Sequence, residues 1–324
     1  MIERAVRYEE KFMTEVYRNK KRYFILFFLA GGFIIYTVFL VAPIVHSMFY
    51  SLFGGPGIVP KEFVGFQNYI QLFTQNPYNE RFFNAFKNTA IFFLIVTFFQ
   101  NFIGFFIAVM VTRRFAGSTF FRRISFLPTT LSVIVAGFLF TLILNPVWGI
   151  FDKFLEAIGL DFLVRPWLGT PSIALVVIAI VTSWQFLGTS IIFYTAGIDS
   201  IENEILEAAR IDGAGPLAEI RYIIFPSVLP VIGIVTILIF IGDFTQFDIV
   251  YAMSSPYANP QYGTDLFGSL FYRAAFFPIG RGGWGMGMGA TVATLIVFIV
   301  TIGVLILMFV FRMQSVGRNK EGIE

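Results

Sequence analysis

The sequence predicts an all-α protein that crosses a lipid bilayer six times. Hydrophobic residues make up 57% of its 324 residues and charged residues only 13%, whereas about 25% of the residues in ordinary soluble domains are charged. Apolar runs of bilayer length, about 20 residues or more, occur at 23–51, 88–112, 124–145, 171–196, 227–250 and 287–311. The predicted fold class is therefore a polytopic, all-α membrane protein.

The first apolar run follows a polar leader, 1–22, and a short polar tail, 313–324, follows the last run. The first run is longer than the apolar core of a signal peptide and lies behind the leader, so we expect it to remain as a span. The membrane domain then covers 23–312. Lys and Arg are more numerous in the leader, the tail and the loops on their side than on the other side, which predicts cytoplasmic termini.

The loops on the opposite side are too short to form an independent domain. They cover about 52–87, 146–170 and 251–286. The last of them is rich in Gly and Pro, which predicts irregular structure around 280–285 and one short helix near 264–276.

The residue inventory argues against enzymatic chemistry on this chain. There is no Cys and only one His, which leaves no thiolate nucleophile and little scope for a metal site. No GxxxxGK[ST] loop for nucleotide binding is present. Asp243 and Asp248, if both lie on one helix, point about 140° apart and do not converge as a catalytic pair. We expect no catalytic residue, no metal ligand and no cofactor on the chain.

A polar loop, 199–226, separates two very apolar halves of the chain. Asp199 and Glu202 resemble a capping box, so a helix is predicted from Ser200 to about Ile211. Helical geometry puts Ile201, Ile205, Ala208 and Ala209 on one face and Asn203, Glu207 and Arg210 on the opposite face. Further on, a sharp turn and a second helix are predicted from Gly213, Gly215 and Pro216.

The same loop carries a recognisable pattern. Glu207, Ala208 and Ala209 are followed by Gly213 and then by Ile223–Pro226, which resembles the EAA loop of binding-protein-dependent ABC importer permeases. Phe225 stands where that pattern has Leu, a mild apolar change. Other segments resemble the maltose and multiple-sugar permeases of this family, among them FVGFQNYIQLF at 63–73, the stretch 121–146, and the stretch 166–201 that leads into the loop.

The resemblance implies roles for residues in the loop. In the family this loop is the coupling helix that docks into a cleft on a cytosolic ATPase subunit. Ala208 and Ala209 would permit close helix approach, and Gly213 would supply the turn. Glu207 would pair with a basic group on the ATPase, and Asp212 is the next candidate for such a contact.

Polar residues within the spans are candidates for the substrate path, because they are costly in a bilayer unless they face a cavity or a partner. Their amides and hydroxyls, together with Trp184, suit a sugar better than a cation. The resemblance to the maltose permease carries its sugar-contacting positions onto Thr129, Thr182, Gln185, Phe186, Thr189, Asp243 and Gln246. The residue types differ at most of these positions, so a different sugar is expected.

The implied function is that of a membrane subunit of an ABC importer in the inner membrane of a prokaryote, moving a sugar or oligosaccharide into the cytoplasm. Implied partners are a second, homologous permease, two cytosolic ATPase subunits that hold ATP and Mg, a solute-binding protein outside the membrane, and the carbohydrate itself; no nucleic acid is implied. Two alternatives stay open: an ion-coupled secondary transporter, for which inverted repeats and broken helices are expected, and an ABC permease for a solute other than a sugar.

Overall fold

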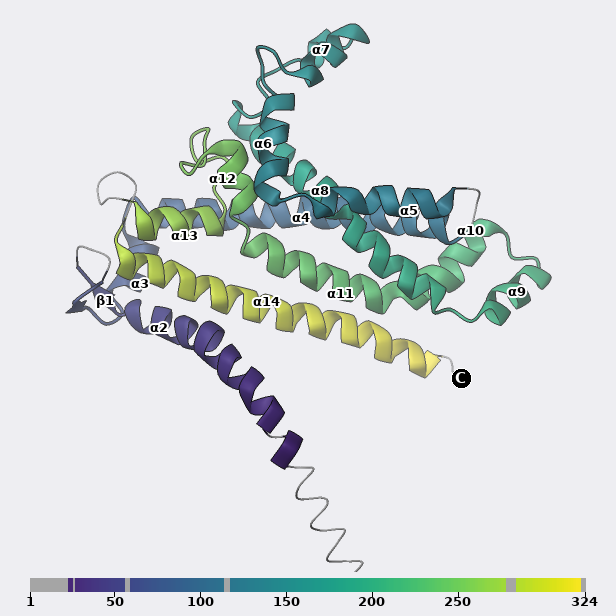
Figure 1. The fold of residues 1–324 in the computed structure, drawn as a ribbon, viewed down its shortest axis with the longest axis horizontal. Coiled ribbons are helices and arrows are strands. Elements are labelled where there is room, and N and C mark those ends of the chain that lie inside the picture. Colours follow the sequence, from purple (N-terminus) through teal and green to yellow (C-terminus); the bar gives the residue numbers. More distant parts are fainter. Residues whose placement is uncertain (1–22, 26, 56–58, 114–116, 278–283, 322–324) are drawn as a thin grey trace, which may run out of the picture.

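The computed structural model describes residues 23–25, 27–55, 59–113, 117–277 and 284–321, and the predicted leader 1–22 lies outside them. Almost all of the regular structure is helical, which confirms the all-α fold class. A two-stranded antiparallel sheet pairs β1 (Phe53–Gly54) with β2 (Glu62–Phe63). Helices α4 (Tyr78–Thr112), α8 (Pro171–Asp199), α11 (Phe225–Phe244) and α14 (Met286–Glu321) lie roughly along one direction, whereas the helix that ends with α2 (Ala42–Tyr50) runs at an angle to them (Figure 1). β1 lies at one end of the molecule and α9 (Asn203–Ile211) at the other.

Within the described residues, five helices are long and apolar enough to cross a membrane, or six if a bent pair of helices at 118–143 counts as one span. They are Tyr23–Tyr50, which includes η1 (Thr37–Val41) and α2 (Ala42–Tyr50), α4 (Tyr78–Thr112), α8 (Pro171–Asp199), Pro216–Phe244, and Met286–Arg312 within α14 (Met286–Glu321). α4 begins ten residues before the predicted span at 88, and α14 continues through most of the predicted tail. These predicted spans are therefore helices in the structure, and α4 and α14 extend beyond the bounds that hydropathy indicates.

The fifth of the predicted spans is one long helix built from three segments. α10 (Pro216–Glu219) leads through a π-helical turn, η4 (Ile220–Ile224), into α11 (Phe225–Phe244). Pro216 occupies the first turn, as predicted, because a proline there loses no intrahelical hydrogen bond. The helix ends at Phe244 rather than at 250, and α12 (Asp248–Ser254) is separate, so Asp243 and Asp248 do not share a helix.

The prediction of one continuous helix over 124–145 is wrong. α5 (Ser118–Phe126) and the 3₁₀ turn η2 (Leu127–Thr130) bend by 96° into α6 (Val133–Ile143). Leu131 and Ser132 between them have extended backbones, with ψ of 143° and 138°. Pro128 lies just before the bend, and α8 supplies partners for the backbone freed there.

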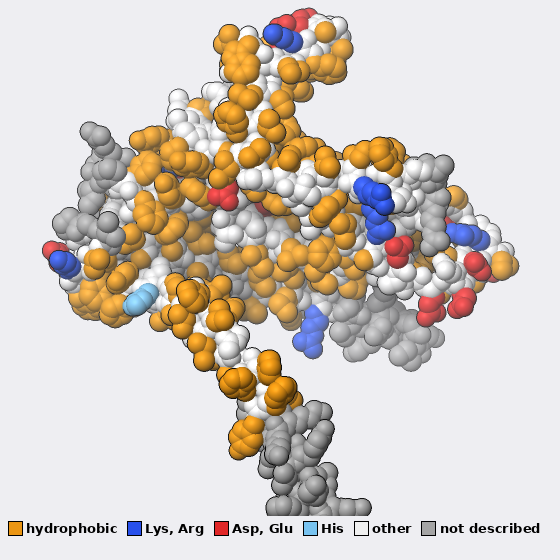
Figure 2. All heavy atoms as spheres, viewed as in Figure 1, with side chains coloured by type: hydrophobic (Ala, Val, Ile, Leu, Met, Phe, Trp, Pro, Cys, Tyr) orange, Lys and Arg blue, Asp and Glu red, His pale blue; other side chains and the backbone are white. Residues whose placement is uncertain are grey.

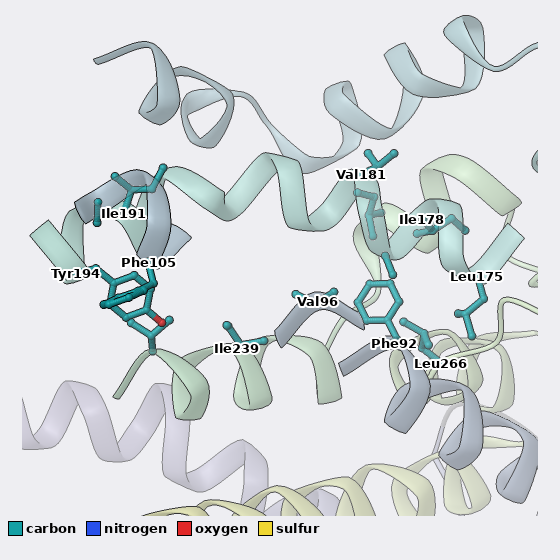
Figure 3. Packing of buried hydrophobic residues seen from close by; sticks show 14 of the residues in the cluster. Phe92, Val96, Phe105, Leu175, Ile178, Val181, Ile191, Tyr194, Ile239 and Leu266 are labelled. Atoms are coloured by element: carbon teal, nitrogen blue, oxygen red, sulfur yellow. The ribbon is translucent and has the colours of Figure 1, made fainter. Parts of the chain in front are cut away.

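Helices α4, α8 and α11 enclose the main hydrophobic core (Figure 3). Phe92 and Val96 of α4 and Ile178 of α8 belong to this core, and the Tyr194 ring of α8 stands edge-on to Phe105 of α4 at 6.1 Å; all five are buried. Small residues allow the two helices to approach closely: a methyl group placed on Gly104 of α4 would lie 3.2 Å from the Ser190 side chain. α4 and α8 are therefore closely packed against each other beside α11.

The outer loops carry short helices. α3 (Gln67–Thr74), α7 (Ile150–Ala157), η3 (Asp161–Leu163) and α13 (Phe267–Phe276) lie in the predicted loop regions, and α13 confirms the helix predicted near 264–276. The irregular structure predicted around 280–285 falls mostly outside the described residues.

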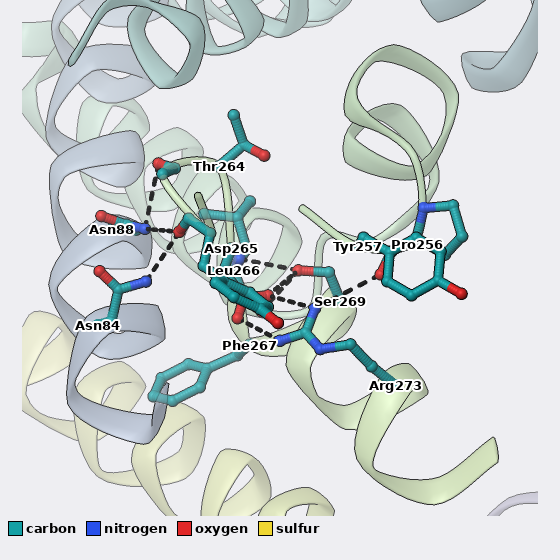
Figure 4. Close-up of polar contacts among 12 residues, drawn as sticks. Asn84, Asn88, Pro256, Tyr257, Thr264, Asp265, Leu266, Phe267, Ser269 and Arg273 are labelled. Atoms are coloured by element: carbon teal, nitrogen blue, oxygen red, sulfur yellow. Dashed lines mark hydrogen bonds and ion pairs between the residues drawn. The ribbon is translucent and has the colours of Figure 1, made fainter. Parts of the chain in front are cut away.

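A buried polar cluster fastens the segment before α13 (Figure 4). The Arg273 guanidinium donates to both carboxylate oxygens of Asp265, at 3.2 and 2.5 Å, and Asp265 also accepts from the Ser269 hydroxyl at 2.7 Å. Asn84 and Asn88 of α4 donate to backbone carbonyls of Tyr262 and Gly263. Full burial raises the pKa of the Asp265 carboxyl, and the Arg273 charge opposes that rise.

Candidate functional site

The polar loop begins with α9 (Asn203–Ile211), an exposed helix at the end of the molecule opposite β1 (Figure 1). The start predicted at Ser200 is wrong, because α8 continues to Asp199 and Ser200 caps its end. Glu202 occupies the N-cap position without a side-chain cap bond, so the predicted capping box does not form. Gly213 ends the helix with a left-handed φ of 83°, which confirms the predicted turn.

The faces of α9 differ in part from those predicted. Leu206 packs against the core, whereas Ile205 and Ala208 point outward with Glu207. Ala209 is half-buried, and Asp212 is exposed beside the turn. The face that α9 presents is therefore mixed, with an apolar ridge beside the Glu207 carboxylate.

Glu219 of α10 fastens this loop to the membrane helices. Its carboxylate accepts a hydrogen bond from Arg210 of α9 at 2.5 Å and lies 3.7 Å from Arg113 at the end of α4. Arg113 also donates to the Pro216 carbonyl at 3.2 Å. Charged side chains gather at this end of the molecule, while the middle is covered by apolar side chains (Figure 2). The loop is thus exposed on its outer side and tied to α4 and α10 on its inner side.

A cavity of about 240 Å³ lies between α4, α8 and α11. Its lining combines amide, hydroxyl and carboxyl groups with two aromatic rings, and comprises Gln100, Thr182, Phe186, Thr189, Ser190, Phe193, Val235, Leu238, Ile239, Gly242, Asp243 and Gln246. A hydrogen bond of 3.3 Å joins the Ser190 hydroxyl to the Gln100 side-chain oxygen across the cavity wall. Such a lining can hold a ligand rich in hydroxyl groups.

The structure brings together five of the seven residues predicted for the substrate path: Thr182, Phe186, Thr189, Asp243 and Gln246. Thr182 also donates to the Ile178 carbonyl of its own helix at 2.9 Å. Trp184 lies outside the cavity, edge-on to Phe140 at 5.1 Å. The role of these residues toward a sugar stays a prediction.

The other two, Thr129 and Gln185, lie at the bend between η2 and α6 instead. The Gln185 amide donates to the Leu131 carbonyl at 3.1 Å, and the Thr129 hydroxyl donates to the Gln185 carbonyl at 2.9 Å. A broken helix at membrane depth requires such partners for its free backbone groups. Both side chains therefore hold the bend in place.

Sequence reasoning missed the contribution of Phe193 to the cavity and gave no role to Glu219 beyond membership of the polar loop. In the sequence, Phe193 is one more apolar residue of a span, and nothing in its spacing marks it.

Asn101, a polar residue inside α4, holds neighbouring helices together. Its side chain accepts a hydrogen bond from the Tyr194 hydroxyl at 2.6 Å and donates one to the Thr236 hydroxyl at 2.9 Å. Within the described residues, no group of three or more His, Cys, Asp or Glu could hold a metal ion.

Comparison with known proteins identifies the family. Residues 100–315 match the family described as binding-protein-dependent transport system inner membrane component. The chain belongs to this family. The permease is 31% identical over 269 residues to the probable ABC transporter permease protein YurN of Bacillus subtilis, covering 82% of the chain and 88% of that protein.

Two other relatives have names that state a cargo. The permease is 31% identical to the multiple sugar-binding transport system permease protein MsmF of Streptococcus mutans, covering 77% of the chain and 83% of MsmF. It is also 31% identical to the lactose transport system permease protein LacF of Rhizobium radiobacter, covering 77% and 82%. The resemblance noted from the EAA pattern is thereby confirmed at the level of the family.

The fold has a solved counterpart. A crystal structure described as a bacterial ABC transporter involved in the import of the acidic polysaccharide alginate has a chain with a TM-score of 0.74 and 22% identity. The match covers 93% of the permease and 98% of that chain. The permease therefore shares the importer fold over nearly its whole length.

Proposed function

We propose that the permease is the membrane-spanning subunit of an ABC importer that moves a sugar or oligosaccharide into the cytoplasm. Its family membership and its multi-pass helices support a transport subunit. The names of MsmF and LacF support a carbohydrate cargo. The cavity supports it too, because amides, hydroxyls and aromatic rings are the groups that bind sugars.

One observation carries the proposal: an ion pair ties the exposed helix α9 to the long helix that reaches the cavity. Arg210 of α9 pairs with Glu219 at the end of α10, and α10 runs through η4 into α11. α11 carries Asp243 into the cavity. A displacement of α9 would then reach the cavity wall through this ion pair and the helix behind it.

The loop is the surface at which we place the ATPase. Glu207 is exposed next to Ile205 and Ala208, so it can meet a basic group of a partner while the apolar ridge packs. Two ATPase subunits would bind and hydrolyse ATP with Mg and draw the loops of two paired permeases together. Two states of the paired permeases would then alternate, one open to a solute-binding protein outside and one open to the cytoplasm. Both termini of the chain would be cytoplasmic.

Reconstitution tests this proposal. The permease is placed in proteoliposomes with its partner permease, ATPase subunits and solute-binding protein, and the uptake of labelled sugar and the hydrolysis of ATP are measured together. Uptake that requires ATP and every subunit supports the proposal. Ion-driven sugar uptake by this chain alone contradicts it and favours a secondary transporter.

A further inference from the structure

Helix α6 leaves the bundle of long helices sideways. The break before it is held by Gln185, which lies midway along α8. α6 then runs at 96° to the helix that precedes the break, so it is directed away from the other spans. Figure 1 shows α6 and α7 projecting from the side of the molecule. Residues 133–158 thus form an arm that begins halfway along a membrane-spanning helix.

The inner side of the arm is packed. A methyl group placed on Gly137 of α6 would lie 2.7 Å from the Ala252 side chain of α12, so these two helices are in close contact. In α7, Asp152 is buried and accepts a hydrogen bond from the Trp167 indole at 2.7 Å. The Phe151 ring also stands against Trp167, at 5.3 Å. These contacts fix which face of α7 is turned outward.

The outer face of the arm is apolar and uncovered. Ile150 and Phe154 are four residues apart, so they share one face of α7, and Ile158 continues that face at the end of the helix. Their exposed fractions are 73%, 56% and 52%. Exposed apolar residues continue along α6 and the turn after it: Ile134, Val135, Phe138, Leu139, Val147 and Trp148. Hydrophobic side chains cover this projection in Figure 2. An apolar surface of this kind marks a contact with lipid or with another protein.

Lipid does not suit the whole of this surface. The turn at 145–149 between α6 and α7 is not helical, and non-helical backbone does not occur exposed to lipid within the hydrocarbon region. Lys153 and Glu156 are exposed on α7 beside the apolar face, and charged side chains are costly in hydrocarbon. A protein surface can cover the apolar face and also offer polar partners to the turn and the charges.

The depth of the arm selects the protein. α6 starts midway along α8, whereas the ATPase subunits and the solute-binding protein act from the two aqueous sides. We propose that the arm docks on the second permease of the transporter, with Ile150, Phe154 and Ile158 buried in the contact. This inference rests on the proposed function and assigns to it a surface at which the two membrane subunits meet.

Site-specific photocross-linking tests the partner. Benzoyl-phenylalanine replaces Phe154 in the complete transporter in proteoliposomes, with the partner permease, ATPase subunits and solute-binding protein, and the adducts are identified by mass spectrometry. The expected adduct joins position 154 to the second permease, whether that is a homologue or a second copy of this chain. An adduct with the solute-binding protein, or with lipid alone, overturns the inference.

A control at Ile211, 85% exposed at the end of α9, separates this inference from the proposed function. Benzoyl-phenylalanine at position 211 is expected to form an adduct with an ATPase subunit. That adduct without a permease adduct from position 154 overturns the docking of the arm alone. Failure of the unmodified transporter to take up sugar with ATP contradicts the proposed function itself.

Substitutions then measure the contribution of the apolar face. Phe154→Ser should leave the fold of the single chain intact, because the side chain is exposed there. It is expected to lower the amount of second permease retained in detergent roughly 10-fold or more, the effect of losing the burial of one large apolar side chain. Lys153→Gln, at an exposed position of the same helix, is the matched control and should retain the wild-type amount. Equal retention by both variants, each with the wild-type unfolding temperature, overturns the inference.

Discussion

Arg210 on α9 and Glu219 on α10 are joined by a hydrogen-bonded ion pair of 2.5 Å across the turn at Gly213. The Glu219 side chain is 7% exposed and that of Arg210 is 60% exposed, so the pair lies at the edge of the protein with the carboxylate inside. This ion pair joins the exposed helix α9 to the long helix that begins with α10.

Loss of this pair is expected to loosen the coupling loop. In a double-mutant cycle of Arg210→Gln and Glu219→Gln, we expect a coupling energy of about 1 kcal/mol, reduced by the exposure of Arg210. Thermal unfolding of the assembled transporter gives this energy, and the number of sugars moved per ATP should fall in both single variants. Arg113→Gln is the comparison: its 3.7 Å contact should give a smaller effect. Purely additive effects of Arg210 and Glu219 would contradict the pairing.

Glu207→Ala is expected to spare assembly and binding-protein docking but to uncouple ATP hydrolysis from uptake. Glu207 is exposed on α9, so its removal leaves no buried group unpaired. Uptake and hydrolysis are measured in the same vesicles. Glu204→Ala, an exposed glutamate on the same helix, is the matched control and should keep more of the coupling. Wild-type transport by Glu207→Ala would count against its role at the ATPase.

Gln185→Leu is expected to destabilise the bend between η2 and α6. The substitution removes the amide that donates to the Leu131 carbonyl, and leaving that group unpaired at membrane depth costs about 1–3 kcal/mol. A lower unfolding temperature in detergent, with the sugar path otherwise retained, is the expected outcome. Gln75→Leu, at an exposed position after α3, should leave the unfolding temperature unchanged. Equal stability of the two variants would show that the amide is dispensable.

Asp265→Asn should be among the most damaging single substitutions in the outer segment. It leaves the Arg273 guanidinium, 3% exposed, without its charged partner, and breaking one side of a buried pair costs about 3–5 kcal/mol. Loss of folded protein after extraction, or a large fall in unfolding temperature, is the measurement. Asp161→Asn, on the exposed turn η3, is the control. Unaltered stability of Asp265→Asn would mean that Arg273 finds another acceptor.

Hydropathy predicted the spans because apolar length is dictated by bilayer thickness and needs no partner. It did not predict the 96° bend, because the apolar residues on both sides of Thr129, Thr130 and Ser132 make the whole run long enough for one span. Pro128 was the available signal, but a proline in a membrane helix does not by itself break it. Gln185, whose amide donates the hydrogen bond that stabilises the break, is more than fifty residues away in the chain.

In the candidate site, too, local sequence patterns were predictive, whereas features that depend on distant contacts were not predicted. The pattern around Glu207 is local, so the loop could be recognised from spacing alone. The start of α9 was misplaced because Asp199 stays in α8, where it contacts Arg122 from α5 at 3.8 Å. For the cavity, five of the seven predicted substrate-path residues line it, whereas the polar groups of Thr129 and Gln185 bond at the bend between η2 and α6; the role of all seven toward a sugar stays a prediction.

The unbroken helix from Pro216 to Phe244 places Glu219 and Asp243 about 36 Å apart along one axis, at 1.5 Å per residue. Side chains near one end can be exchanged without disturbing those at the other, since sites so distant contribute independently. If the cavity selects the cargo and α9 engages the ATPase, as we propose, the two functions can therefore evolve separately. In the function we propose, a lineage that acquires a new sugar would need changes in the cavity lining and could keep its ATPase.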